Sequence, residues 1–274
     1  MCTFTAIATD PAQDHKNHDK KKIRICFNRD ELRSRPPGKN PEIFALHDIQ
    51  YIMPVDTQSG GTWIAMNDAG IFFAILNVNP GLQGEDDEFK KSGNTEKTFL
   101  SRGLIIPSLI GLRNIADVKN KLKDIDVDRY PGFRLVFIDT HGMNAGYLRH
   151  DGINLELNCR RWNGQPVFYT SSGLGDEYVY DDRIKLFHKM FDGFDGNPVY
   201  EKKQDEFHSH QWKDKKDVSV NMERKNAITV SRSVIEIIDS HIKFIHYMPP
   251  FAPVPSVIEM KSISPSGITD SASC

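Results

Sequence analysis

Alternating apolar and polar positions predict strands along most of the chain. Residues 3–8 alternate, and residues 23–27 form a β-branched run, so the two segments predict a hairpin that begins directly after Cys2. A second hairpin is expected from residues 63–66 and 71–77, which flank an Asn-Asp-Ala-Gly turn. Its second strand is apolar on both faces, as expected for a central strand covered on both sides. Further strands are expected at 134–139, 144–148, 153–157, 166–170, 227–238 and 242–247.

Apolar residues at helical spacing predict helices over 99–112, 115–122 and 178–191. The proline-rich stretch 36–41 and the polar stretch 195–217 are expected to be irregular. Strands and helices occur in blocks, which favours an α+β sandwich over alternating βαβ units. We expect a single domain over residues 1–250 and a poorly ordered C-terminal tail over 251–274.

Composition and charge narrow the classes of partner. The 274 residues are 39% hydrophobic, and the net charge is -2, so a globular core is expected and nucleic acid is an unfavourable partner. No apolar run approaches the roughly 18 residues of a membrane-spanning helix. The first residues lack the charged region of a secretory signal, which favours a cytoplasmic location.

Neither cysteine nor histidine spacing predicts a metal site. The four cysteines show no CxxC pair, so we expect reduced thiols and neither a zinc site nor a disulfide framework. His208 and His210 lie two apart in a polar stretch without an obvious third ligand, so a solvated loop is the favoured interpretation. We expect no cofactor.

Cys2 has two interpretations. On position alone it is a small residue at the start of a strand. Removal of Met1 would instead give one residue both a thiol and an α-amine, whose ordinary pKa of about 7.7–8.0 suits a general base.

Several short motifs favour the second interpretation. They are Cys2, Asn28-Arg29-Asp30-Glu31, Gly60-Gly61-Thr62-Trp63, Asn77, residues 170–176 with Arg183, and Arg224 with residues 229–231. In this order, from residue 2 to about 250, they together resemble the NRDE family, also called the transport and Golgi organization 2 family. That family in turn resembles the N-terminal-nucleophile (Ntn) hydrolases of the choloylglycine hydrolase and penicillin V acylase type. The resemblance implies a four-layer αββα sandwich of two mostly antiparallel sheets covered by helices.

The resemblance implies four catalytic residues. Cys2 would be the nucleophile, Arg29 would lie beside it, Asp30 would hold its amine, and Asn77 would donate to the oxyanion. An arginine favours the thiolate and a carboxylate favours the ammonium. A surface ion pair in a turn is the alternative for Arg29 and Asp30, and a turn cap is the alternative for Asn77.

The resemblance also implies five binding residues. Ser171 and Ser172 lie near the position of a second oxyanion Asn in the hydrolases, and offer hydroxyls there. Surface charges are the alternative interpretation of Arg183 and Arg224. The five residues are Trp63, Ser171, Ser172, Arg183 and Arg224.

Two functions therefore remain open. The first is a cysteine amidohydrolase that cleaves a C–N bond of a small, non-peptide or peptide-like amide through a thioester. The second is a non-catalytic protein that binds or traffics a lipid, acyl-CoA or haem on the same scaffold.

Overall fold

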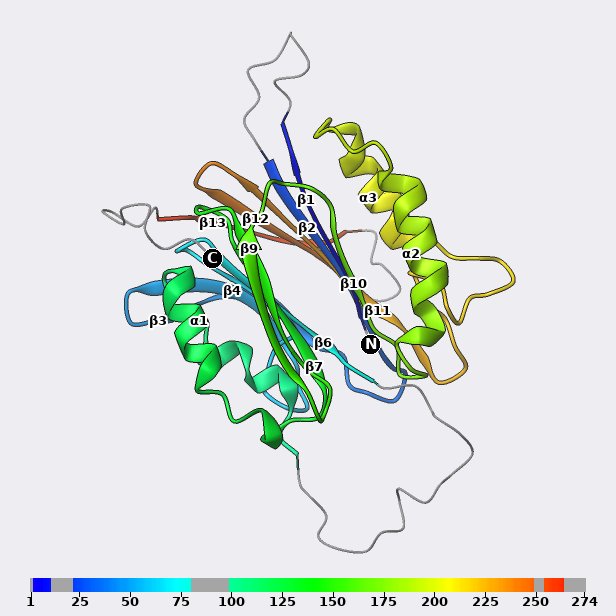
Figure 1. Ribbon diagram of the computed structural model, residues 1–274, viewed down its shortest axis with the longest axis horizontal. Helices are drawn as coiled ribbons and strands as arrows, with labels where there is room; N and C mark the ends of the chain where they lie inside the picture. The colour runs from blue at the N-terminus through cyan, green and yellow to red at the C-terminus, as the bar shows by residue number, and fades with distance from the viewer. Residues whose placement is uncertain (1, 11–21, 80–98, 249–253, 264–274) are drawn as a thin grey trace, which may run out of the picture.

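Two antiparallel sheets pack face to face in the computed structural model, which describes residues 2–10, 22–79, 99–248 and 254–263. Helices cover the outer face of each sheet, which gives the expected four-layer α+β sandwich (Figure 1). The six-stranded sheet has the order β10 (Val167–Thr170), β1 (Cys2–Thr9), β2 (Lys22–Leu32), β11 (Ala227–Ile238), β12 (His241–Tyr247) and β13 (Ser256–Lys261). The seven-stranded sheet has the order β3 (Lys39–Leu46), β4 (Ile49–Val55), β5 (Ile64–Asn67), β6 (Ile71–Asn77), β7 (Phe133–Asp139), β8 (Asn144–His150) and β9 (Leu155–Arg161).

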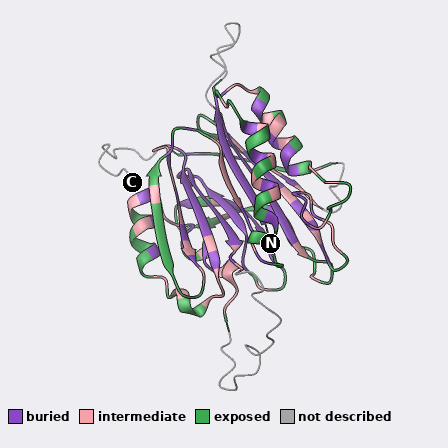
Figure 2. Ribbon diagram, turned by 45° about the vertical axis from the view of Figure 1, so that its right-hand side comes forward, coloured by how far each residue is buried: buried purple, intermediate pink, exposed green. Residues whose placement is uncertain are grey.

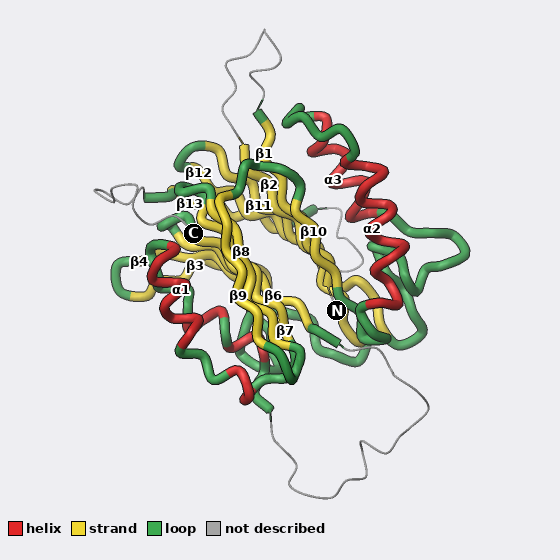
Figure 3. The backbone as a smooth tube through the Cα atoms, in the orientation of Figure 1, coloured by secondary structure: helices red, strands yellow, loops and turns green. Residues whose placement is uncertain are grey.

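Within the described residues, three α-helices form the outer layers (Figure 3). Helix α1 (Ile115–Lys123) lies on the seven-stranded sheet, and its first turn is capped by Asn114, whose side chain accepts a hydrogen bond from the Asp117 N–H at 2.9 Å. Helices α2 (Glu177–Phe191) and α3 (Val199–Ser209) lie on the six-stranded sheet. Among the described ranges, every helix is too short or too polar to span a bilayer.

Successive side chains of β1 point to opposite faces of its sheet, an inner face towards the other sheet and an outer face towards the helices. Phe4 points inward and stacks on Phe72 of β6 with ring centroids 5.9 Å apart, which joins the two sheets. Thr5 points outward, and its hydroxyl hydrogen-bonds the His208 ring of α3 at 2.8 Å. Figure 2 shows that buried residues concentrate on the strands, so the core lies between the sheets. Cys2 therefore shares the inner face with Phe4.

The sequence missed four elements. Strands β3 and β4 replace the irregular segment expected around residues 36–41, and Pro41 is tolerated because β3 is an edge strand with a shifted register. Helix α3 replaces part of the loop expected at 195–217. Strand β13 pairs with β12, so residues 256–261 do not belong to a disordered tail.

Two further expectations were wrong. Residues 99–112 contain the 3₁₀ turns Arg102–Leu104 and Ile106–Ser108 in place of a helix, because two glycines and Pro107 interrupt the segment. Cys159 is disulfide-bonded, whereas Cys2 and Cys26 carry free thiols.

His246 makes the stability of the fold depend on pH. Its Nδ1 hydrogen-bonds the Ser233 hydroxyl at 2.8 Å, and burial, with a smaller contribution from the Arg29 charge, lowers its pKa from 6.5 to about 4. The unfolded chain therefore binds the proton first, so stability is complete above pH 6.5 and falls as the pH drops towards 4. We expect protonation of His246 alone to lower the free energy of unfolding by up to about 3 kcal/mol between pH 6.5 and pH 4.

Urea unfolding at pH 7 and pH 4.5 checks the expectation. His246→Gln should lose less stability between the two values than the parent does. His241→Gln is the control, because His241 is exposed at the start of β12. Equal losses in the parent and in His246→Gln would contradict this role of His246.

Candidate active site

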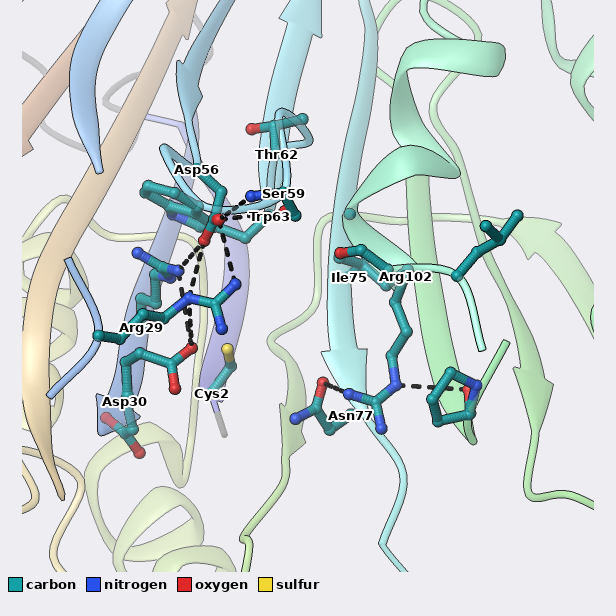
Figure 4. A pocket seen from close by; sticks show the side chains of 16 residues that line it. Cys2, Arg29, Asp30, Asp56, Ser59, Thr62, Trp63, Ile75, Asn77 and Arg102 are labelled. Atoms are coloured by element: carbon teal, nitrogen blue, oxygen red, sulfur yellow. Dashed lines mark hydrogen bonds and ion pairs between the residues drawn. The ribbon is translucent and has the colours of Figure 1, made fainter. Parts of the chain in front are cut away.

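A cavity of about 300 Å³ opens between the two sheets at the end where β1 begins (Figure 4). Strands β1 and β2 form one wall, and the end of β6 and the segment around Arg102 form the facing wall. Its polar and charged lining residues are Cys2, Arg29, Asp30, Glu31, Arg35, Asp56, Ser59, Thr62, Trp63, Asn77, Ser101 and Arg102.

The Cys2 thiol faces this cavity. The register of β1 and β2 places Cys2 directly opposite Arg29, so both side chains lie on the inner face. Cys2 is 6% exposed, and burial raises the pKa of its thiol; the Asp30 charge adds to the rise, whereas the Arg29 charge and the Asp30 N–H oppose it. Arg29 favours the thiolate, as expected, but burial outweighs its charge, so the thiol is mainly neutral. A nucleophilic Cys2 therefore needs a base.

The main-chain nitrogen of Cys2 has a defined partner. It donates to the Ser171 hydroxyl at 3.0 Å, and the Ser171 N–H donates to the Cys2 carbonyl at 2.9 Å. Ser171 follows β10 directly and is fully buried, so it is held in place beside the start of β1. Ser171 thus contacts the nitrogen of the candidate nucleophile, where we had expected a position near the oxyanion.

Arg29 belongs to a buried charge cluster and not to a surface turn. Its guanidinium lies 2.5 Å from Asp56 and 4.0 Å from the centre of the Trp63 ring. Although burial opposes ionisation of Asp56, hydrogen bonds from Arg35 and the Ser59 N–H, together with the Arg29 charge, lower its pKa to about 2. The Asp56 carboxylate therefore stays ionised and fixes Arg29 beside the thiol.

Asp30 borders the cavity and also faces α2. The Thr229 hydroxyl donates to Asp30 at 2.6 Å, and an Arg183 nitrogen lies 3.8 Å from the other carboxylate oxygen. Burial raises the Asp30 pKa, and the Arg183 charge is the largest opposing effect. Asp30 is thus a buried acid held by β11 and α2.

Asn77 lies at the end of β6, across the cavity from Cys2 (Figure 4). Its carbonyl oxygen accepts a hydrogen bond from Arg102 Nη1 at 2.7 Å. Because a guanidinium only donates, this contact fixes which end of the Asn77 amide is the oxygen. The NH₂ end of Asn77 is then left to face the cavity on the Cys2 side.

The remaining expected binding residues divide into two groups. Trp63 lines the cavity. Ser172 and Arg224 do not line it; an Arg224 nitrogen donates a hydrogen bond to the Ser172 hydroxyl at 3.2 Å. Arg183 does not line the cavity; it is completely buried and donates to Thr3, Thr170 and the carbonyls of residues 218 and 219, so the alternative of a surface charge was wrong.

A second cavity, of about 420 Å³, adjoins the first. Arg29, Glu31, Arg35 and Trp63 line both cavities and therefore form the wall between them. The second cavity is mainly apolar, because its lining includes Leu32, Pro36, Pro37, Ile228, Val230 and Met248.

Sequence reasoning missed three charged residues of the first cavity: Arg35, Asp56 and Arg102. Arg35 and Asp56 flank two unrecognised strands, and Arg102 lies in the segment that we expected to be helical. No local pattern marks them, since their neighbours in space come from other parts of the chain. No described group of three or more His, Cys, Asp or Glu residues could hold a metal, and His208 contacts Thr5 and Asn28.

Comparisons with known proteins bear on the family and the fold of this chain. A family model described as Transport and Golgi organisation 2 matches residues 3–224. No curated protein matches the sequence significantly. Among solved structures, a mutant conjugated bile acid hydrolase from Clostridium perfringens is 11% identical with a TM-score of 0.50, over 94% of this chain and 92% of that one. A Caenorhabditis elegans N-acylethanolamine-hydrolyzing acid amidase ortholog is 12% identical with a TM-score of 0.52, over 85% and 92%. At these identities the similarity establishes only the fold, an α+β sandwich of two antiparallel sheets that this chain shares with both structures.

Proposed function

This chain belongs to the Transport and Golgi organisation 2 family, and on that premise we propose that it is an amidohydrolase whose nucleophile is Cys2. One observation carries the proposal: the thiol lines a cavity while the nitrogen of the same residue is held at 3.0 Å by the Ser171 hydroxyl. A nucleophile and a potential base are thereby fixed together at one point of the fold.

Removal of Met1 would convert the Cys2 nitrogen into a primary amine. Because burial raises the thiol pKa, the thiol stays protonated near neutral pH, and the amine accepts its proton as the sulfur attacks the amide carbonyl carbon. The carbonyl π electrons move to the oxygen, which becomes an oxyanion. The Asn77 NH₂ group then donates a hydrogen bond to it, a role supported by the Asn77 Oδ1 contact with Arg102, which leaves the NH₂ end for the substrate.

Collapse of this intermediate breaks the C–N bond. The Cys2 ammonium passes its proton to the departing nitrogen, so a neutral amine leaves and a thioester remains on sulfur. Water then attacks the thioester with the α-amine as base. The products are the carboxylic acid and the regenerated thiol.

The apolar cavity favours a second candidate function, the binding of a lipid-like or acyl-CoA ligand without cleavage. Its volume of about 420 Å³ falls within the usual range of roughly 300–1,000 Å³ for small-molecule sites. The two functions differ in whether a covalent acyl group appears on Cys2.

Mass spectrometry after incubation with p-nitrophenyl butyrate tests the proposal. We expect the chain to begin at Cys2 and to carry one butyryl group on that residue. Cys26 is an internal control, because it is fully buried and burial raises its pKa to about 12, so it should stay unmodified until the protein unfolds.

Retained Met1 would leave Cys2 without its amine and would overturn the mechanism. A butyryl group on another residue in place of Cys2 would do the same. A chain that begins at Cys2, stays unacylated and binds lipid would support the second function.

A further inference from the structure

Arg102 differs from the other two arginines of the Cys2 cavity. Arg29 and Arg35 each lie within 4.0 Å of both Asp56 and Glu31, so carboxylates neutralise their charges. Arg102 instead donates to two neutral oxygens, Asn77 Oδ1 at 2.7 Å and the Pro131 carbonyl at 3.3 Å. In the described part of the chain, no carboxylate lies within 4.0 Å of the Arg102 guanidinium.

This charge is held in an unfavourable environment. Burial lowers the pKa of Arg102, and among the charges that oppose this the thiolate of Cys2 acts most strongly, ahead of Glu31 and Asp176. A partly buried guanidinium without a counter-ion costs folding free energy. Such a cost is typical of a group that acts on charge which develops during a reaction.

One nitrogen of the Arg102 guanidinium is available to a substrate. Its Nη1 and Nε atoms bind Asn77 and Pro131, which leaves Nη2 without a hydrogen-bond partner among the described residues. Both Arg102 and Asn77 line the cavity wall opposite Cys2 (Figure 4). Nη2 and the Asn77 NH₂ group are therefore two donors without a hydrogen-bond partner among the described residues, on the cavity wall opposite Cys2.

Serines stand at positions 171 and 172, near the position of the second oxyanion Asn in the hydrolases that the sequence resembles, and neither serine offers a donor to the cavity. Ser171 accepts from the Cys2 nitrogen, and the Ser172 hydroxyl accepts from Arg224 and from the Leu174 N–H. Neither serine lines the cavity. The second donor must therefore come from elsewhere on the cavity wall.

We propose that Arg102 is the second oxyanion-stabilising residue of this site: it fixes the Asn77 amide through Nη1 and directs its own charge and Nη2–H at the oxygen of the tetrahedral intermediate. This inference rests on the proposed function of Cys2. As the Cys2 sulfur bonds to the carbonyl carbon, negative charge appears on the carbonyl oxygen, and Arg102 supplies the positive charge that faces it. Arg29 has no comparable freedom, because Asp56 already neutralises it.

Acylation and alkylation of Cys2 together test this role, because acylation by p-nitrophenyl butyrate forms an oxyanion whereas alkylation by iodoacetamide does not. Arg102→Met should slow acylation by about 100-fold or more, the usual effect of losing an oxyanion donor. The rate of alkylation at a pH high enough to ionise the thiol fully should change less than about threefold, since only thiolate access then matters. Arg102→Lys keeps the positive charge, so its acylation rate should lie between those of the parent and of Arg102→Met.

Arg129→Met is the matched control, because Arg129 is an exposed arginine of a nearby 3₁₀ turn. It should leave both rates unchanged. Equal slowing of acylation and alkylation in Arg102→Met would show that Arg102 only shapes the cavity, and unchanged acylation would overturn the inference outright while Cys2 remained the nucleophile. Absence of acylation in the parent protein would instead refute the proposed function, so the two failures are distinguishable.

Discussion

Replacing Cys2 with alanine is expected to lower amide hydrolysis by at least about 10⁴-fold, because the variant loses the only atom that forms a bond to the substrate. The inner face of β1 should accept the smaller side chain, since Cys2 lies at the end of the strand and at the edge of the core. Initial rates with a panel of N-acyl amides, measured beside circular dichroism, check both parts of the expectation.

Two companion variants separate the thiol from the amine. Cys2→Ser keeps the amine and should retain a small residual rate, because a hydroxyl is a poorer nucleophile than a thiol. A chain with one uncleaved residue ahead of Cys2 keeps the thiol and loses the amine, and it should also be inactive. If that extended chain kept full activity, another group would have to act as the base.

Replacing Arg183 with leucine is expected to destabilise the protein by about 3–5 kcal/mol, the typical effect of breaking a buried ion pair by removing one partner. Arg183 is completely buried, and its guanidinium makes four hydrogen bonds that tie α2 to β1, β10 and the segment at residues 218–219. The substitution also leaves the Asp30 carboxylate without the positive charge at 3.8 Å. Chemical denaturation measures the loss.

Lys185→Leu is the control for this variant, because Lys185 is an exposed neighbour on α2, and it should change stability by less than about 0.5 kcal/mol. Adding Asp30→Asn to Arg183→Leu should recover part of the loss, since the buried negative charge is then removed as well. A loss no larger than that of the control would contradict a structural role for Arg183.

The hydrophobic pattern was sufficient to predict a strand where that strand has one buried face or is wholly apolar. Strands β1, β6, β7 and β11 follow from it, because alternation or continuous apolar character sets their faces. Helix α3 does not follow from it, because two of its buried side chains are polar. Gln204 donates to Thr5, and His208 hydrogen-bonds Asn28. Such contacts between distant segments leave no periodic signal in the sequence.

The candidate site was predictable only to the extent that motifs mark it. The sequence indicated Cys2, Arg29, Asp30 and Asn77, and all four border one cavity. It did not indicate Asp56 or Arg102, because each acts through a partner that is about 25 residues away or more along the chain. The fold determines where all six of these side chains lie, and any part that they play in catalysis is a proposal.

The residues that we propose for catalysis are divided between the two sheets. The thiol and Arg29 belong to the six-stranded sheet, whereas Asn77 belongs to the seven-stranded sheet, and contacts such as that of Phe4 with Phe72 set the spacing between them. Neither sheet by itself contains all of the residues that we propose for catalysis. Substitutions among the aliphatic and aromatic side chains at this interlayer boundary could therefore retune reactivity during evolution without altering a single polar group.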